Sequence, residues 1–366
     1  MNAPDLPDLK QAARAAGQFS DEPALGVGSL GRGLINDTFL VSGAAYRFVL
    51  QRINHRVFPD PAAVMANLRI LTDQVRQHQS DPAARGWRLP EIIRTRTGED
   101  LHRDGEGGYW RALSFIEGAR GLESLETEFQ AEQVGHALGR FHALAGSIPA
   151  SALSDTLPGF HIAPGYLARF DAAAARPRPE PDPADLREAL AFVAARRAGI
   201  AVLEEAKARG ELRMRVIHGD PKLDNVLFDE ATGRAVSLID LDTVKPGLIH
   251  YDLGDCLRSC CNRAGETAGT VEARFDLDVC HAILRGYLGE ARAFLTAADR
   301  DYLYDAIRLL PFELGLRFLT DHLSGDVYFK VEERGQNLHR ARVQFRLAGS
   351  VEGQRTTLQR MLSRLS

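Results

Sequence analysis

The stretch that decides the fold is MRVIHGDPKLDNVLFD, residues 214–229. Two short apolar runs, 216–217 and 226–228, are expected to form buried strands on either side of a polar loop. That loop contains an acid, Asp220, and an amide five residues later, Asn225, in the pattern H-x-D-x-x-x-x-N. A carboxylate placed there can accept the proton of a hydroxyl nucleophile, and the amide can ligate a metal ion next to phosphates.

A second pair of acids follows fifteen residues after Asn225, where the apolar run SLI ends in Asp240 and Asp242. Mg²⁺ prefers oxygen ligands and substrate phosphates, so Asp240 is expected to hold Mg²⁺ together with Asn225. Each carboxylate alone is a common cap or turn residue. The combination of strand, H-x-D-x-x-x-x-N, strand and I-D-x-D is much rarer and favours a site for phosphoryl transfer.

Three segments resemble the aminoglycoside phosphotransferase and choline kinase superfamily, whose members are relatives of the protein kinases: VIHGDPKLDNVLF (216–228), SLIDLDTVKPG (237–247) and HYDLGD (250–255). The resemblance implies that Asp220 is the catalytic base and that Asn225 and Asp240 bind Mg²⁺. Three more residues would assist at the metal or substrate, or brace the loop: Asp242, His218 and Asp252.

The resemblance also implies an α+β, two-lobed protein-kinase-like fold. The N-terminal lobe, residues 1–117, is expected to bind nucleotide and to contain a five-stranded antiparallel sheet with one helix. That helix is predicted at 59–75, where apolar residues recur at helical spacing after two prolines. The C-terminal lobe, residues 118–366, reads as mainly helical and is expected to carry catalysis and substrate binding.

A glycine-rich stretch lies near the start of the first lobe. GVGSLG, residues 26–31, matches a dinucleotide-binding G-x-G-x-x-G, but it runs into the strand-like DTFLV instead of a helix. A phosphate-covering hairpin fits better, with Gly31, Gly33, Asn36 and Thr38 facing ATP; Asn36 replaces the third glycine because Asn tolerates positive φ. An ordinary glycine-rich hairpin is the alternative.

The third strand, YRFVLQRI, lacks the lysine that touches the nucleotide phosphates in protein kinases. Gln51 stands at that position, and Asn67 stands near where the following helix should supply a glutamate. We expect a Gln51–Asn67 hydrogen bond in place of the ion pair, with Arg32 in the hairpin as a compensating cation. Arg52 is expected to point to the opposite face of the strand.

Adenine is expected to bind at the connection between the lobes, near Ser114 and Ile116, through mostly backbone contacts. The narrower resemblance is to the N-acetylhexosamine 1-kinase family, through GLINDTFLV (33–41), FVLQRINHRVFPDPAAVMANL (48–68) and the segment 313–347. Members of that family phosphorylate the anomeric hydroxyl of N-acetylglucosamine or N-acetylgalactosamine with ATP.

This resemblance implies that Arg317 and Tyr328 contact the sugar, beside Asp220. An amphipathic helix that ends at Ser324 and Gly325, with its charges on the surface, is the alternative interpretation of the same segment.

Composition excludes several classes of protein. Forty-five Lys and Arg against 49 Asp and Glu give a net charge of −4, which does not favour a nucleic-acid partner. The N-terminus lacks the pattern of a signal peptide, and no apolar run is long enough to span a bilayer. We therefore expect a cytoplasmic enzyme, a monomer or homodimer, that binds a nucleotide and a small molecule but neither nucleic acid nor membrane.

Two other functions remain open from the sequence. One is a kinase for a different small alcohol, such as an aminoglycoside, choline or an amino alcohol. The other is a pseudokinase that binds nucleotide without catalysis, which the absence of the third-strand lysine would favour.

Overall fold

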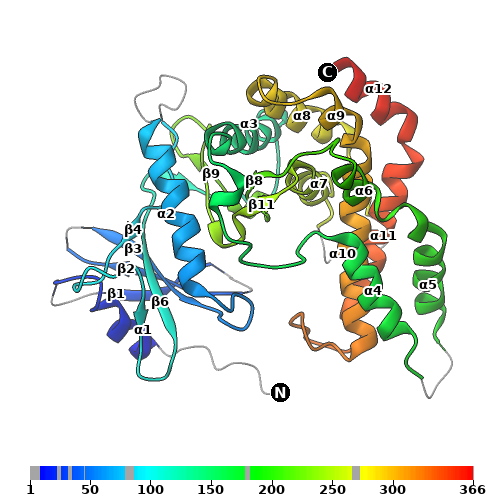
Figure 1. Ribbon diagram of the computed structural model, residues 1–366. Helices are drawn as coiled ribbons and strands as arrows, with labels where there is room; N and C mark the ends of the chain where they lie inside the picture. The colour runs from blue at the N-terminus through cyan, green and yellow to red at the C-terminus, as the bar shows by residue number, and fades with distance from the viewer. Residues whose placement is uncertain are drawn as a thin grey trace.

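The computed structural model describes residues 9–22, 26–31, 35–44, 46–78, 86–177, 182–265 and 273–365. These residues form two lobes, a lobe built on an antiparallel sheet and a larger lobe made mainly of helices (Figure 1). The expected two-lobed protein-kinase-like fold is confirmed.

The sheet of the first lobe has the strand order β1-β2-β3-β6-β4, and β5 also pairs with β6. All of its pairings are antiparallel. The strands are β1 (Gly26–Ser29), β2 (Asp37–Ser42), β3 (Arg47–Ile53), β4 (Ile92–Ile93), β5 (His102–Arg103) and β6 (Tyr109–Ser114).

Two elements of this lobe were not expected from the sequence. The two-residue strand β5 makes the sheet six-stranded where five strands were expected, and helix α1 (Leu9–Ala16) packs on one face of the sheet. Ala12 and Ala16 of α1 join a buried cluster with Phe48 and Trp110 from the strands. Alanine packs closely against a sheet but gives a weak apolar periodicity, which explains why α1 escapes notice.

Helix α2 (Pro61–Gln77) is the helix predicted after the third strand. The carboxylate of Asp60 accepts a hydrogen bond from the N–H of Ala63 (3.0 Å), and Pro61 occupies the first turn, a combination that starts helices. The apolar residues at helical spacing are buried, and Leu68 and Leu71 join the core of the helical lobe. Helix α2 therefore lies between the sheet and the second lobe (Figure 1).

The second lobe consists of helices around one large apolar core. Helices α3 and α8 approach so closely that a Cβ added to Gly135 would lie 1.8 Å from the carbonyl oxygen of Ile283. Its helices are α3 (Glu128–Ala145), α4 (Ala163–Ala174), α5 (Ala184–Arg196), α6 (Val202–Ala208), α7 (Ile249–Cys260), α8 (Leu277–Ala291), α9 (Ala297–Asp301), α10 (Leu303–Ser324), α11 (Gln336–Gly353) and α12 (Arg355–Leu365).

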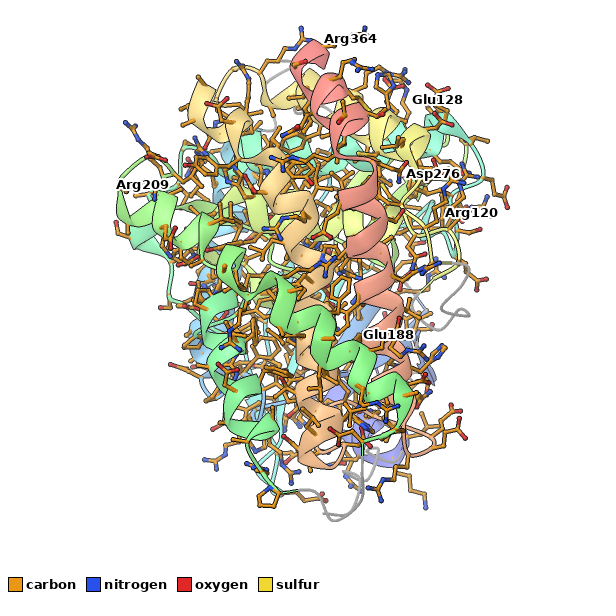
Figure 2. All side chains as sticks on the ribbon, turned by 90° about the vertical axis from the view of Figure 1, so that its right-hand side faces the viewer. Arg120, Glu128, Glu188, Arg209, Asp276 and Arg364 are labelled. Carbon is orange, nitrogen blue, oxygen red and sulfur yellow. The ribbon has the colours of Figure 1, made fainter. Side chains whose placement is uncertain are left out.

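The outer face of this lobe is formed by α5, α11 and α12 (Figure 2). Glu188 of α5 lies beside α11, where its carboxylate accepts a hydrogen bond from Arg342 (3.0 Å). Within the described segments, none of the helices is both long and apolar enough to cross a bilayer.

Two small sheets of the second lobe carry the polar loops, and their apolar residues join its core. One pairs β8 (Arg215–Ile217) with β11 (Lys245–Gly247), and the other has the order β10-β9-β7. Its strands are β7 (Ala119–Arg120), β9 (Val226–Asp229) and β10 (Ala235–Leu238). The loop 218–225 thus leaves one sheet and enters the other, so that both of its ends are fixed by paired strands.

Candidate active site

One buried carboxylate supports the start of the loop 218–225. Asp252, at the start of α7, accepts hydrogen bonds from the backbone N–H groups of His218 (2.7 Å) and Gly219 (2.8 Å). Its carboxylate also lies 2.9 Å from Nε2 of His142 on α3. Hydrogen bonds to a charged acceptor are stronger than neutral ones, so the loop is fixed to two helices.

Gly219 and His218 fit this position for separate reasons. Gly219 has φ = 89°, and a Cβ there would lie 2.7 Å from the carbonyl oxygen of Thr243, so the position requires glycine. Burial lowers the pKa of His218, which is therefore neutral. Its Nε2 donates to the carbonyl of Ile239 (3.0 Å), which leaves Nδ1 to accept from the N–H of Asp220 (3.3 Å).

The carboxylate of Asp220 faces a lysine that the sequence analysis did not single out. Lys222 Nζ lies 2.7 Å from Asp220 Oδ2, and the amide of Asn225 donates to the carbonyl oxygen of Asp220 (2.7 Å). Burial opposes a charge on Lys222, but Asp220, Asp240 and Asp255 outweigh it and raise its pKa. Lys222 is therefore positively charged beside the carboxylate of Asp220.

Asp240 is brought next to this loop by the backbone. The N–H of Ile239 donates to the carbonyl of Asn225 (2.9 Å), and Asp240 then adopts the left-handed conformation, with φ = 64°. Solvent still reaches its side chain, yet the surrounding protein desolvates it, and together with the charges of Asp242 and Asp220 this raises the pKa of Asp240 to about 7. A strained backbone conformation at such a position is common in functional sites.

These oxygen donors fit Mg²⁺. The carboxylates of Asp220, Asp240 and Asp242 repel one another, and a cation would relieve this repulsion. Among the residues that the structure describes, no three or more His, Cys, Asp or Glu side chains form a cage that could hold a metal alone. Mg²⁺ is usually held by one or two carboxylates together with substrate phosphates and water, so Asn225 and Asp240 would suffice.

The glycine-rich hairpin is described only in part. Gly33 lies outside the described residues, as does Arg32, while Gly31 has φ = 70°. Thr38 lies in β2, where its carbonyl accepts from the N–H of Leu30 (2.9 Å) and closes the hairpin.

The reason given for Asn36 was wrong, because this residue does not have a positive φ. Asn36 instead uses its side chain. Its Nδ2 donates to Asp242 Oδ2 (2.5 Å), and its Oδ1 accepts from the N–H of Asn54 (2.9 Å). An asparagine at this position therefore joins the hairpin to the acidic segment of the other lobe.

The expected Gln51–Asn67 hydrogen bond does not form. Asn67 points away from the third strand, and its Nδ2 donates to the carbonyls of Ser154 (2.8 Å) and Val244 (2.9 Å). Its Oδ1 accepts from the N–H of Ser154 (2.9 Å). The spacing of sixteen residues places Asn67 on the correct helix, but the side chain joins that helix to the second lobe.

Gln51 is paired with an arginine from the neighbouring strand. Arg111 of β6 donates to Gln51 Oε1 from Nε (3.0 Å) and Nη2 (2.7 Å), and it forms an ion pair with Asp242. Arg52 is the register partner of Trp110 and so lies on the opposite face, as expected. The cation near the third strand was missed because it comes from a different strand, 60 residues later.

The connection between the lobes begins where β6 ends. The hydroxyl of Ser114 accepts from the N–H of Glu91 (2.8 Å), so this side chain is used within the sheet. Ile116 is buried, and no backbone hydrogen bond engages it among the described residues. Its N–H and C=O are therefore without a backbone partner in the described part of the chain, and the adenine contact stays a prediction.

Arg317, on α10, lies among three aromatic rings. Its guanidinium carbon is 5.1 Å from the ring centroid of Phe160, 5.2 Å from Tyr166 and 5.6 Å from Phe329. Tyr328 is 57% exposed and makes an edge contact with Phe329. We call Arg317 and these three rings the aromatic wall. Tyr328 lies at its solvent-exposed edge.

Two buried groups connect this wall to the loop 218–225. His161, with φ = 62°, lies 3.0 Å from Glu313 Oε1 through Nδ1 and 2.9 Å from the carbonyl of Gly219 through Nε2. Burial opposes the imidazolium, but Glu313 and Asp255 together raise the pKa of His161. His161 therefore has a structural role, and Glu313, the first residue of the segment 313–347, is its partner, a role that the sequence did not indicate.

The side chain of Asp321 also has a structural role. Its Oδ1 accepts from the N–H groups of Val327 and Tyr328, and its Oδ2 accepts from that of Phe329, all at 2.9 Å. Asp321 is 5% exposed, so it is not a surface charge of an amphipathic helix. It fixes the segment that carries the two aromatic residues.

The fold and these polar groups define the class: a protein with a protein-kinase-like fold in which a candidate base lies beside candidate metal ligands. The comparison of sequences identifies the family. Residues 27–294 match the model of the phosphotransferase enzyme family, which is most of the chain. The chain belongs to this family.

Solved structures of similar fold cover nearly the whole chain. The microcompartment-associated aminopropanol kinase is 16% identical with a TM-score of 0.67, over 96% of this chain and 99% of the other. The aminoglycoside 2'-phosphotransferase-IIIa in its GDP complex is 14% identical with a TM-score of 0.61, over 92% of this chain and 98% of the other. The choline kinase of Streptococcus pneumoniae is 14% identical with a TM-score of 0.55, over 92% of this chain and 99% of the other. At these identities the similarity shows the fold, and the resemblance to N-acetylhexosamine 1-kinases stays a prediction.

Proposed function

We propose that this phosphotransferase is a small-molecule kinase that transfers the γ-phosphate of ATP to a sugar hydroxyl, specifically the anomeric hydroxyl of an N-acetylhexosamine. The observation that carries phosphoryl transfer is the position of Asp220. Its loop is fixed through Asp252, while its side chain remains 28% exposed to solvent, beside Lys222 and Asn225.

In the proposed reaction, the carboxylate of Asp220 accepts the proton of the sugar hydroxyl. The hydroxyl oxygen forms a bond to the γ-phosphorus, and the bond from that phosphorus to the bridging oxygen of ADP breaks. Lys222 fixes the carboxylate of Asp220 and adds a positive charge near the transferred group. Asn225 and Asp240 would hold Mg²⁺, which when bound neutralises charge on the phosphates.

The aromatic wall supports a sugar as the acceptor. Sugar rings stack on aromatic faces, and their hydroxyl and acetamido oxygens accept hydrogen bonds from a guanidinium. Arg317 has its guanidinium beside Phe160 and Tyr166, with Tyr328 at the rim. A cation that already occupies these aromatic rings disfavours an ammonium group in the same place.

A kinase for an amino alcohol or an aminoglycoside is the second candidate. Glu313 favours it, because its Oε2 is buried without a hydrogen-bond partner among the described residues. A turnover screen for ADP release separates the two functions, with N-acetylglucosamine, N-acetylgalactosamine, choline, an amino alcohol and an aminoglycoside as acceptors. The sugar proposal requires turnover of an N-acetylhexosamine and none of its 1-deoxy analogue; turnover of an amine alone would refute it.

The role of Asp220 is tested with Asp220→Ala. We expect kcat to fall by roughly 10²–10⁴-fold, the usual contribution of a general base, while ADP still binds. Asp224→Ala is the matched control, because Asp224 is an exposed carboxylate in the same loop. Near-normal turnover by Asp220→Ala would exclude Asp220 as the base.

A further inference from the structure

A row of polar side chains crosses three strands of the N-terminal sheet. Thr38 of β2 is the register partner of Gln51 of β3, which is in turn the register partner of Arg111 of β6. Directly opposed residues in antiparallel strands point to the same face. The row is connected by hydrogen bonds, because Gln51 Nε2 donates to Thr38 Oγ1 (3.1 Å) and Gln51 Oε1 accepts from Arg111.

The row ends on the acidic segment of the other lobe. Arg111 forms an ion pair with Asp242, and each of these side chains is only 2% exposed. Asp242 also accepts from Asn36 of the hairpin. Asp242 stands two residues after Asp240, the candidate metal ligand, and Arg111 lies close enough to Asp240 for its charge to act on that carboxylate.

The guanidinium of Arg111 has more N–H donors than Gln51 and Asp242 use. The guanidinium group carries five N–H donors. Gln51 and Asp242 engage Nε and Nη2, whereas the two donors on Nη1 make no hydrogen bond within the described part of the chain. Nη1 is not completely buried, so its two donors remain available to an acceptor from outside the chain, such as a phosphate oxygen.

We propose that Arg111 is the phosphate-binding cation of the nucleotide site and that it replaces the absent lysine of the third strand. Asp242 pairs with this cation as the glutamate of the following helix does in protein kinases, and Gln51 holds the guanidinium in place. The inference rests on the proposed function, because it requires that a nucleotide binds in this cleft.

A purely structural connection between the lobes is the competing explanation for the same contacts. Such a connection would affect stability and would weaken every ligand of the cleft to a similar extent. A phosphate-binding cation would affect only ligands that carry phosphate. The ratio of the affinities for ADP and adenosine therefore separates the two explanations without any measurement of turnover.

The experiment is isothermal titration of ADP and of adenosine into the full chain and its variants. For Arg111→Met we expect ADP to bind at least about tenfold more weakly, the effect of one charge-assisted hydrogen bond. Adenosine should change by less than about twofold, which also shows that the variant is folded. Arg52→Met is the matched control, since Arg52 lies on the opposite face of the same sheet.

A second variant keeps the experiment informative if Arg111→Met is poorly folded. Arg111→Met leaves Asp242 without its cation, whereas the double variant Gln51→Lys with Arg111→Met returns a cation to the third strand. We expect this double variant to recover ADP affinity to within about threefold of the original protein. Full affinity for adenosine with ADP as weak as in the single variant would overturn the inference.

Two further outcomes are decisive. If Arg111→Met weakens ADP and adenosine equally, or weakens neither, Arg111 does not bind phosphate. If the unaltered protein binds adenosine and ADP with no preference for ADP, no phosphate site exists, and the proposed function fails together with the inference.

Discussion

Replacing Asn67 by alanine distinguishes the observed role of this side chain from the one that its spacing suggests. In the structure Asn67 is 2% exposed and joins α2 to the second lobe by three hydrogen bonds with Ser154 and Val244. If Asn67 instead faced Gln51 in the nucleotide cleft, its loss would affect nucleotide binding and leave stability almost unchanged.

The expected magnitude follows from these three bonds. A buried hydrogen bond contributes about 1 kcal/mol net, and a buried partner left unsatisfied costs about 1–3 kcal/mol. The variant leaves the buried C=O of Val244 without its partner, whereas Ser154 is exposed and its N–H and C=O can turn to water. We therefore expect Asn67→Ala to lower the free energy of unfolding by roughly 2 kcal/mol.

Urea unfolding followed by tryptophan fluorescence measures this change. The two tryptophans, Trp87 and Trp110, are both buried and lie close to α2 or in the sheet. Gln74→Ala is the matched control, because Gln74 lies on the same helix but its hydrogen bond to Ser147 is exposed. A loss below about 1 kcal/mol for Asn67→Ala, together with a raised KM for ATP, would refute the assignment.

Two further predictions concern the second lobe. Gly135→Ala should destabilise the protein by more than about 3 kcal/mol, because its Cβ would meet the carbonyl of Ile283 at 1.8 Å. Gly289→Ala, with nothing within 4 Å, should stabilise α8 by up to about 1 kcal/mol in the same urea-unfolding assay; equal effects of the two substitutions would refute the close contact. Because the pKa of His161 is raised in the fold by Glu313, the stability lost in His161→Gln should be largest below about pH 6.5 and should shrink as pH rises through the raised pKa. A loss that stays constant between about pH 6 and 9 would show that the imidazole is uncharged.

The loop with Asp220 and Asn225 could be predicted because its chemistry is local. Base, amide and turn all lie within eight residues, and paired strands at both ends leave the loop little freedom. The prediction of α2 succeeded for a similar reason, since periodicity and an Asp-Pro start are properties of one segment. Local patterns of this kind do not depend on how distant segments meet.

The surroundings of Gln51 could not be predicted, because they depend on register. Gln51 meets Arg111 only through the pairing of β3 with β6, and nothing in either segment states how the two strands align. Asn36 shows the same limit, since its partner Asp242 lies 206 residues later. Lys222 stands within the predicted loop, two residues after Asp220. Its role as a cation becomes visible only in the fold, which places three carboxylates around it.

The contacts of Asn36, Arg111 and Asn67 also set a kinetic condition on the enzyme. All three reach from the sheet lobe to the other lobe and end on buried partners at Asp242 and Val244. If the lobes must separate for ADP to leave, these contacts break in a single event, with little water available to replace them beforehand. Product release, more than the chemical step, would then limit turnover, and the rate would depend on temperature as steeply as a local unfolding event does.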